Sequence, residues 1–284
     1  MKKAQIVVIL AVIAIVGYLY YLPIKGLVKP KEGHANNGMV TGSKPVAATT
    51  ISADMVSVTA KTAIGANLSV KITDLEDQLK KAVDEKQKEN LQRQLAKQWD
   101  DVNQPAPAGF YYLELARKDN KFEDWLDAGN RFNDAYRSTQ DSTIQAGLVA
   151  NSVEAFQNAT KLKPDNLDAK AGLGVADVNG GDPSPMTGIF LLRDVVAKDP
   201  NNRIAILNLG LFAMKSGQYE KAIPRFKALI AQKPEIEPYF YLAESYKQLG
   251  QKQEAIEAYQ KCKELMPDPS FGKRIDDFIK ELKK

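Results

Sequence analysis

Residues 207–234 read LNLGLFAMKSGQYEKAIPRFKALIAQKP, and residues 241–267 read YLAESYKQLGQKQEAIEAYQKCKELMP. Each stretch contains an apolar segment with a small residue, then a glycine, a second apolar segment and a closing proline. Residues 167–200 follow the same order, with about two additional residues before the second segment. Glycine permits a tight turn and proline ends a helix. The sequence therefore predicts an all-α protein built from repeated helical hairpins.

Four positions recur in each hairpin, and each has a physical role. A small residue in the first helix is expected to let the second helix approach closely, so that it faces a large apolar side chain. The small residues are Gly174, Gly210 and Ala243, and the large ones are Leu192, Phe226 and Tyr259. The turn glycines are Gly181, Gly217 and Gly250, and the closing prolines are Pro200, Pro234 and Pro267.

This pattern resembles the tetratricopeptide repeat (TPR) family, whose period is near 34 residues. A single helix pair cannot bury its apolar face alone, so neighbouring pairs must stack. We therefore expect a TPR-like α-solenoid over residues 122–267. The expected units are residues 122–164, which are atypical because of an insertion at 138–148, and then residues 167–200, 203–234 and 236–267.

Two further regions with helical patterns flank these units. Residues 51–121 have apolar residues at helical spacing, interrupted near Asp84–Asn90. They predict either a helical hairpin with its turn there or a coiled coil through which residues 68–100 self-associate. Residues 268–284 have one apolar face and predict a helix that caps the stack or docks onto a partner.

The N-terminus predicts a membrane anchor. Residues 4–22 contain no charged residue, and a helix of that length spans the hydrocarbon core of a bilayer. We expect residues 1–22 to form a short cytoplasmic stub followed by a transmembrane helix in the lipid bilayer. The alternative is a cleaved signal peptide, which the absence of a small-residue cleavage site disfavours. Residues 23–50, rich in Gly, Pro and Lys, are expected to be a flexible tether.

The orientation of this anchor is less strongly determined, because lysines flank both of its ends. The short MKK start resembles bacterial signal anchors that leave the rest of the chain outside the cytoplasm. We therefore expect a single-pass protein of the bacterial inner membrane, with most of the chain in the periplasm.

Composition argues against several classes of function. The net charge of +4 is spread along the chain and forms no basic stripe, so we expect no nucleic-acid partner. The single cysteine, Cys262, and the single histidine, His34, cannot form a catalytic set, and no metal or cofactor motif is present. We expect no enzyme activity, cofactor or metal. Asp100, Asp101, Asp124 and Asp127 are expected on solvated helix faces, and Cys262 in the core.

The resemblance to the TPR family implies where a partner would bind. In TPR arrays the first helices line a concave channel that usually holds a peptide or a helix. The candidate groove positions here are Ala171, Val175, Leu207, Asn208, Leu211, Phe240, Glu244 and Lys247. Only Asn208 matches the subtype that grips a C-terminal carboxylate. A mostly apolar groove instead predicts an amphipathic helix or an extended apolar segment, unless residues 68–100 of this chain fill the channel.

These expectations together indicate a membrane-tethered scaffold or adaptor that binds a protein or peptide partner without catalysis. One alternative is a factor for cytochrome c maturation or a secretion-type chaperone, because some of those proteins use a tethered TPR domain. Another is a structural envelope protein that forms a homo-oligomer through residues 68–100.

Overall fold

The computed structural model describes residues 51–182 and 184–283. Within those residues the chain is helical, with no strand. In chain order the elements are α2 (Ala53–Ile64), α3 (Ala66–Lys81), α4 (Glu85–Asp101), α5 (Pro105–Asp119), α6 (Phe122–Ser138), α7 (Ser142–Leu162), α8 (Leu167–Ala176), the π turn η1 (Asp177–Gly181), α9 (Pro185–Lys198), α10 (Arg203–Lys215), α11 (Tyr219–Gln232), α12 (Ile236–Gln248), α13 (Lys252–Leu265) and α14 (Pro269–Leu282).

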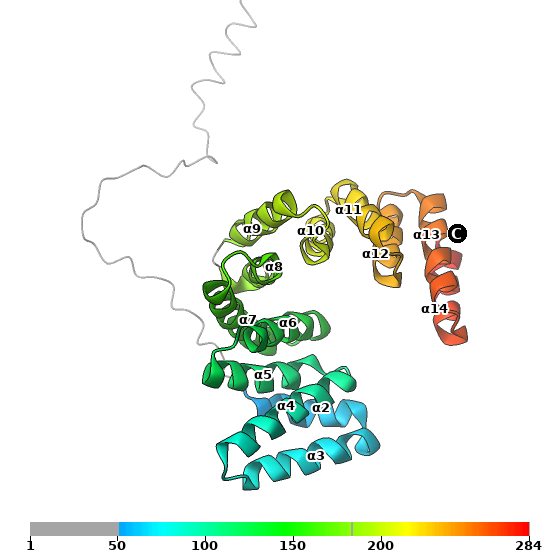
Figure 1. Cartoon of the computed structure of the whole chain (residues 1–284). Helices are drawn as coiled ribbons and strands as arrows, with labels where there is room; N and C mark the ends of the chain where they lie inside the picture. The colour runs from blue at the N-terminus through cyan, green and yellow to red at the C-terminus, as the bar shows by residue number, and fades with distance from the viewer. Residues whose placement is uncertain (1–50, 183, 284) are drawn as a thin grey trace, which may run out of the picture. The chain divides into compact units, whose positions relative to one another are not determined.

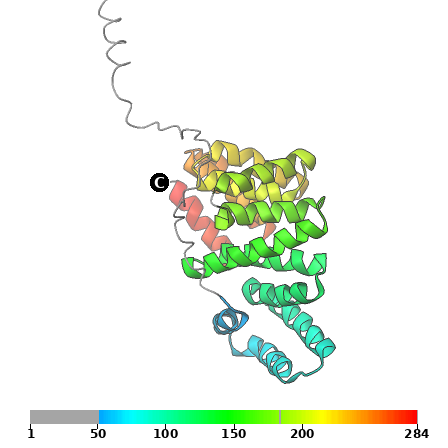
Figure 2. The same ribbon diagram turned by 90° about the vertical axis from the view of Figure 1, so that its left-hand side faces the viewer.

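The helices are arranged as hairpins that stack in chain order (Figures 1 and 2). From α3 onward each helix packs mainly on its neighbours in the sequence, whereas α2 packs mainly on α5. The pairs are α4–α5, α6–α7, α8–α9, α10–α11 and α12–α13. The first helices of neighbouring pairs also touch, as α6 touches α8 and α8 touches α10. The predicted all-α solenoid of helical hairpins is confirmed.

The predicted pairing of small and large residues forms the core of the hairpins. Leu192, Phe226 and Tyr259 are fully buried. A side chain at Gly210 would place its Cβ 2.8 Å from the Phe226 ring, which shows how closely α10 and α11 approach. Since a methyl group needs more room than that, only glycine fits there without movement of the ring.

Two of the three predicted turn glycines are confirmed and one is wrong. Gly217 and Gly250 have φ angles of 73° and 72°, a region that favours glycine because it has no Cβ. In the pair α8–α9 the positive φ, 120°, is at Gly180 instead of Gly181. The reason is η1, in which the last turn of α8 widens before the chain reverses direction.

The insertion predicted near residues 138–148 forms helix. Helix α7 is 21 residues long, whereas α11 has 14, so the additional residues lengthen the second helix of this unit at its N-terminal end. Asp141 caps that end by accepting hydrogen bonds from the backbone N–H groups of Thr143 and Ile144. The lengthened part packs on the start of the described chain, where Ile51 lies against Gly147.

Residues 51–121 contain four helices, α2 to α5, and α3 and α4 are separated by the break at residues 82–84. Helices α4 and α5 form a pair that stacks on α6–α7, so the stack begins well before residue 122. The fully buried Trp99 and Leu95 of α4 lie in the core of this part, together with Ile72 of α3.

Two ion pairs fix α4 against α6, and their charges are reversed relative to each other. Arg93 of α4 donates two hydrogen bonds to Asp124 of α6, at 2.7 and 2.9 Å. Two turns further along, Arg131 of α6 donates to Asp100 of α4, at 2.5 and 3.1 Å. The expectation that Asp100 and Asp124 lie on solvated faces was wrong, because both face a guanidinium group on the neighbouring first helix.

At the C-terminal end, α14 packs on the last hairpin. Phe278 of α14 stacks on Tyr259 of α13, with ring centroids 5.6 Å apart, and Ile275 and Ile279 are buried. Cys262 of α13 is fully buried in the same cluster, as predicted. Burial raises the pKa of its thiol from 9.0 to about 11, so it lacks both the exposure and the thiolate character of a reactive cysteine.

The predicted anchor at residues 4–22 and the predicted tether at residues 23–50 lie outside the described residues. Among the helices from α2 to α14, none combines the length and the apolar character that a membrane span requires.

Candidate partner-binding site

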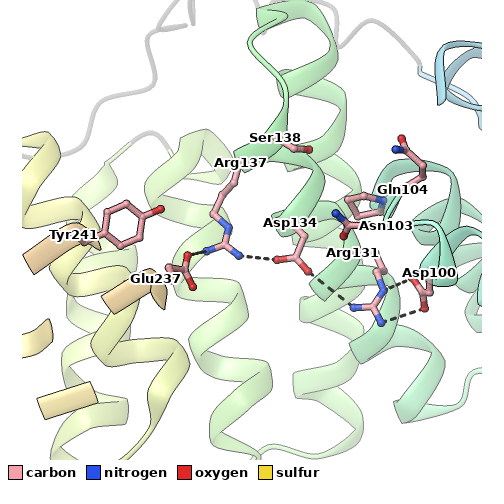
Figure 3. A pocket seen from close by; sticks show the side chains of 10 residues that line it. Asp100, Asn103, Gln104, Arg131, Asp134, Arg137, Ser138, Glu237 and Tyr241 are labelled. Atoms are coloured by element: carbon pink, nitrogen blue, oxygen red, sulfur yellow. Dashed lines mark hydrogen bonds and ion pairs between the residues drawn. The ribbon is translucent and has the colours of Figure 1, made fainter. Parts of the chain in front are cut away.

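The first helices of the hairpins share one surface of the stack, which we call the inner surface. A hollow on this surface has a volume of about 590 Å³ and lies between the α4–α5 connection, α6 and α12 (Figure 3). The residues that line this inner hollow are Asp100, Asn103, Gln104, Pro105, Arg131, Asp134, Arg137, Ser138, Glu237 and Tyr241. The inner hollow is therefore predominantly polar.

Charges of alternating sign run along the inner hollow. Arg131 pairs with Asp100 and also lies 3.9 Å from a carboxylate oxygen of Asp134. Arg137 donates to the other carboxylate oxygen of Asp134 at 3.0 Å. The hydrogen bond to Asp100 and its charge raise the pKa of Arg131. Spacings of three residues place Arg131, Asp134 and Arg137 on one face of α6, which explains how a single helix supplies this row.

The row ends in a contact between residues that are far apart in the sequence. The Arg137 guanidinium lies 3.6 Å from the Glu237 carboxylate of α12, so α6 and α12 meet at the rim of the inner hollow (Figure 3). Both side chains are exposed, at 41% and 48%. Exposed ion pairs contribute at most about 1 kcal/mol, so a ligand with charged groups can replace this one at small cost.

A second, smaller hollow of about 270 Å³ continues the inner surface along α6, α8 and α10. It shares Arg131, Asp134 and Arg137 with the inner hollow. Three of the predicted groove residues, Val175, Leu207 and Asn208, line it. The Asn208 side chain donates to the Ile204 backbone carbonyl at 2.8 Å, so its amide nitrogen is already engaged within α10.

The other predicted groove residues lie elsewhere. Ala171 is fully buried in the core formed by α8, α9 and α10. Leu211 packs against the apolar cluster that contains Phe226 and Tyr259. Phe240, Glu244 and Lys247 lie on the side of α12 that contacts α13 and α14. Their partners there are, in turn, the Phe278 ring, the Tyr259 hydroxyl and the Glu281 carboxylate.

The inner surface differs from the predicted apolar groove in two respects. Its larger hollow is lined by charged residues, because α6 contributes a polar face. The predicted groove positions, of which Ala171 is the first, include none from α6. Residues 68–100, which were considered as a segment that fills the channel, contribute only Asp100 to the inner hollow. The helix that packs on the predicted position Phe240 is α14. The predicted site residues therefore form a partial set, of which three line the inner surface.

The residues that the prediction missed carry a weak signal in the sequence. Arg131, Asp134 and Arg137 are spaced three residues apart, as on one face of a helix. They belong to the unit that matches the repeat poorly, and they were therefore not predicted as groove residues. Among residues 51–182 and 184–283, no cluster of three or more His, Cys, Asp or Glu side chains has the geometry to hold a metal ion. The chemistry that the inner hollow offers is thus ion pairing and hydrogen bonding.

A stack of helix hairpins whose first helices form a common inner surface defines a helical-repeat scaffold. Sequence models of the tetratricopeptide repeat match residues 205–237 and 236–269. Residues 205–269 therefore contain tetratricopeptide repeats, and repeats of this kind serve as scaffolds for protein interactions. None of the curated proteins is significantly similar to it in sequence.

Solved structures similar to this chain include two that are described as TPR proteins. The thermophilic TPR protein TTC0263 of Thermus thermophilus is 20% identical, with a TM-score of 0.54 over 66% of this chain and 97% of that protein. MamA is 21% identical, with a TM-score of 0.41 over 62% and 90% of the two chains. YrrB, described as a TPR protein with an unusual peptide-binding site, is 18% identical, with a TM-score of 0.41 over 66% and 91%. At such identities the likeness concerns the fold.

Proposed function

We propose that this chain is a non-catalytic scaffold that binds a polar segment of a partner protein in the inner hollow. The observation that carries the proposal is the row of charges from Asp100 to Glu237 on the inner surface of a TPR stack. Carboxylates on the partner would pair with Arg137, and its cationic groups with Glu237. Tyr241, which is partly exposed at the same rim, offers a flat surface for an apolar side chain.

The weak Arg137–Glu237 pair supports this proposal energetically. A partner that offers one carboxylate and one cation exchanges a single exposed ion pair for two. Because a bound segment would cover these groups and exclude water, the new pairs would be stronger than surface pairs of the same geometry. The affinity therefore depends on both charges of the rim.

The first test identifies the partner. A photo-crosslinking amino acid replaces Tyr241 in the full chain, and a matched variant carries it at Glu254, which is exposed on α13 and lines none of the hollows described above. We expect a discrete cross-linked protein, identified by mass spectrometry, from position 241 alone. The same products from both positions, or none from either, would contradict the proposal.

The second test measures the role of the charges, and it is a prediction of magnitude. With the purified partner, Glu237→Arg should weaken binding about tenfold or more in titration calorimetry, because it places like charges opposite Arg137 and the partner's cation. Glu254→Arg, the matched control, should leave the affinity unchanged. Equal affinity of all three proteins would show that the partner binds elsewhere.

We also propose that residues 4–22 hold this scaffold at the bacterial inner membrane, with the repeats in the periplasm. The support is the absence of charged residues over a length that spans a bilayer. Alkaline phosphatase fused after Lys284 should be active. Green fluorescent protein fused at the same place and exported by the general secretory pathway should not fluoresce. The reverse pattern would place the repeats in the cytoplasm, and recovery in the soluble fraction after lysis would exclude an anchor.

A further inference from the structure

A hollow of about 520 Å³ lies between the second helices α9 and α11 and the end of α10. It shares no residue with the hollows of the inner surface. Its floor is apolar and includes Ile189, Leu209 and Phe212. Four cations also line it: Arg193, Lys215, Lys221 and Arg225. We call this hollow, with its floor and its four cations, the basic cleft.

The cations of the basic cleft have no carboxylate partner among residues 51–182 and 184–283. Elsewhere in that range, guanidinium groups such as those of Arg117 and Arg203 pair with glutamates at short distance. Lys221 donates to the neutral Gln218 amide at 2.7 Å. No carboxylate lines the cleft, and the nearby Asp194 pairs with Lys198 instead. Four unneutralised cations therefore surround one apolar floor.

Arg225 shows that this arrangement is costly without a partner. Its side chain is partly buried, and burial together with the charge of Arg193 lowers its pKa. Repulsion between like charges near an apolar floor destabilises the free protein, and an anionic group placed between them removes that cost. The geometry of the cleft is therefore complementary to negative charge.

Helix α9 also exposes apolar side chains, one of them in the lining of the basic cleft. Met186 and Phe190 lie one turn apart on α9 with exposed fractions of 48% and 60%, and Met186 lines the cleft. Large apolar side chains exposed next to a pocket mark sites of contact with other molecules. A ligand that fits the cleft therefore has both an apolar face and negative charges.

We propose that the basic cleft binds an acidic amphipathic segment of a partner protein. One or two apolar side chains of the segment would fill the floor beside Ile189 and Phe212, and its carboxylates would pair with Arg193 and Arg225. A volume of about 520 Å³ can hold a few side chains of a peptide segment. A flat bilayer surface, by contrast, would leave a concavity of that size unfilled. Residues 23–50 of this chain are unsuitable by charge, because they contain four lysines and a single glutamate.

The test uses the full chain in detergent and a labelled helical peptide with leucines on one face and glutamates on the other. Fluorescence anisotropy should show binding that weakens with salt. Matched peptides with lysine in place of glutamate, or alanine in place of leucine, should bind about tenfold more weakly or not at all. Equal binding of the glutamate and lysine peptides would overturn the proposal, as would no binding of any peptide.

Variants of the chain assign the binding to this cleft. Arg193→Glu/Arg225→Glu should reduce the affinity at least about tenfold. The control Lys252→Glu/Lys280→Glu changes the same total charge at two exposed lysines outside the cleft and should retain the affinity. An equal loss of affinity in both variants would show that binding depends only on the net charge of the chain, and this would overturn the proposal. Binding of phosphatidylglycerol vesicles that requires Arg193 and Arg225, without binding of the acidic peptide, would assign the cleft to lipid and likewise overturn it. A thermal melt by circular dichroism confirms that each variant is folded.

Discussion

Gly188→Ala is expected to lower the free energy of unfolding by about 3 kcal/mol, the upper end of the range for overpacked cores. Gly188 lies in α9, where it touches α8 and η1. A Cβ at this position would lie 2.3 Å from the backbone carbonyl oxygen of Gly174 and 2.8 Å from the backbone nitrogen of Val178. Backbone atoms cannot rotate away as a side chain can, so α9 must separate from α8 to admit the methyl group.

The measurement is the midpoint of urea denaturation of the full chain in detergent, followed by far-UV circular dichroism. Gly272→Ala in α14 is the matched control, because its nearest neighbour would be the flexible Cε of Lys263 at 3.6 Å. Alanine favours a helix over glycine by about 1 kcal/mol, so the control should be as stable as the parent chain or more stable. A Gly188→Ala protein with an unchanged midpoint would show that α8 and α9 do not approach as closely as described.

This close approach is also a case where the sequence was informative. A small residue of the first helix was predicted to face a large apolar side chain of the second, and Gly174 of α8 does so, since a Cβ there would lie 3.0 Å from Cγ of Leu192. The reason is that contacts within a hairpin depend on short sequence separations, and the repeat period makes those separations regular. Leu192, Phe226 and Tyr259 were predictable as core residues for the same reason.

The inner hollow could not be predicted in the same way. Arg137 and Glu237 lie on first helices with two hairpins, α8–α9 and α10–α11, between them. Their proximity depends on the rotation that each repeat adds to the stack. A small error in that rotation accumulates along the chain, so no local pattern indicates which residues meet. Asn208, by contrast, lines the inner surface as predicted. The face of a helix on which a residue lies depends on its position within that helix alone.

The two ion pairs between α4 and α6 are an intermediate case. Arg93 and Asp124, like Asp100 and Arg131, are separated by 31 residues, and the two pairs have opposite polarity. Read singly, each residue resembles a solvated charge on a helix. Once α4–α5 is treated as a repeat unit, the same spacing indicates contacts between successive first helices. The pattern is less clear here because this unit has no glycine at its turn and no proline at its end, and the positive φ angles at those places belong to Asn103 and Asn120.

The second large effect is expected at the first of those pairs. Arg93→Met should lower the free energy of unfolding by about 3 kcal/mol, because it leaves a buried carboxylate without its partner. The Asp124 side chain is only 5% exposed, and both of its oxygens accept hydrogen bonds from the Arg93 guanidinium. The N-terminal turn of α6 favours a negative charge there but does not replace a bidentate cation.

The double variant Arg93→Met/Asp124→Leu separates charge burial from packing. Because it removes both charges and fills the space with apolar atoms, it should recover most of the loss in urea denaturation. Lys118→Met is the matched control, since Lys118 is 38% exposed like Arg93 but pairs with Glu85, whose side chain is 66% exposed. The control should leave the denaturation midpoint unchanged. If Arg93→Met behaves like Lys118→Met, water reaches Asp124 in solution and the pair does not fix α4 against α6. A loss that persists in the double variant would show that the methylene groups of Arg93, and not its charge, hold the two first helices together.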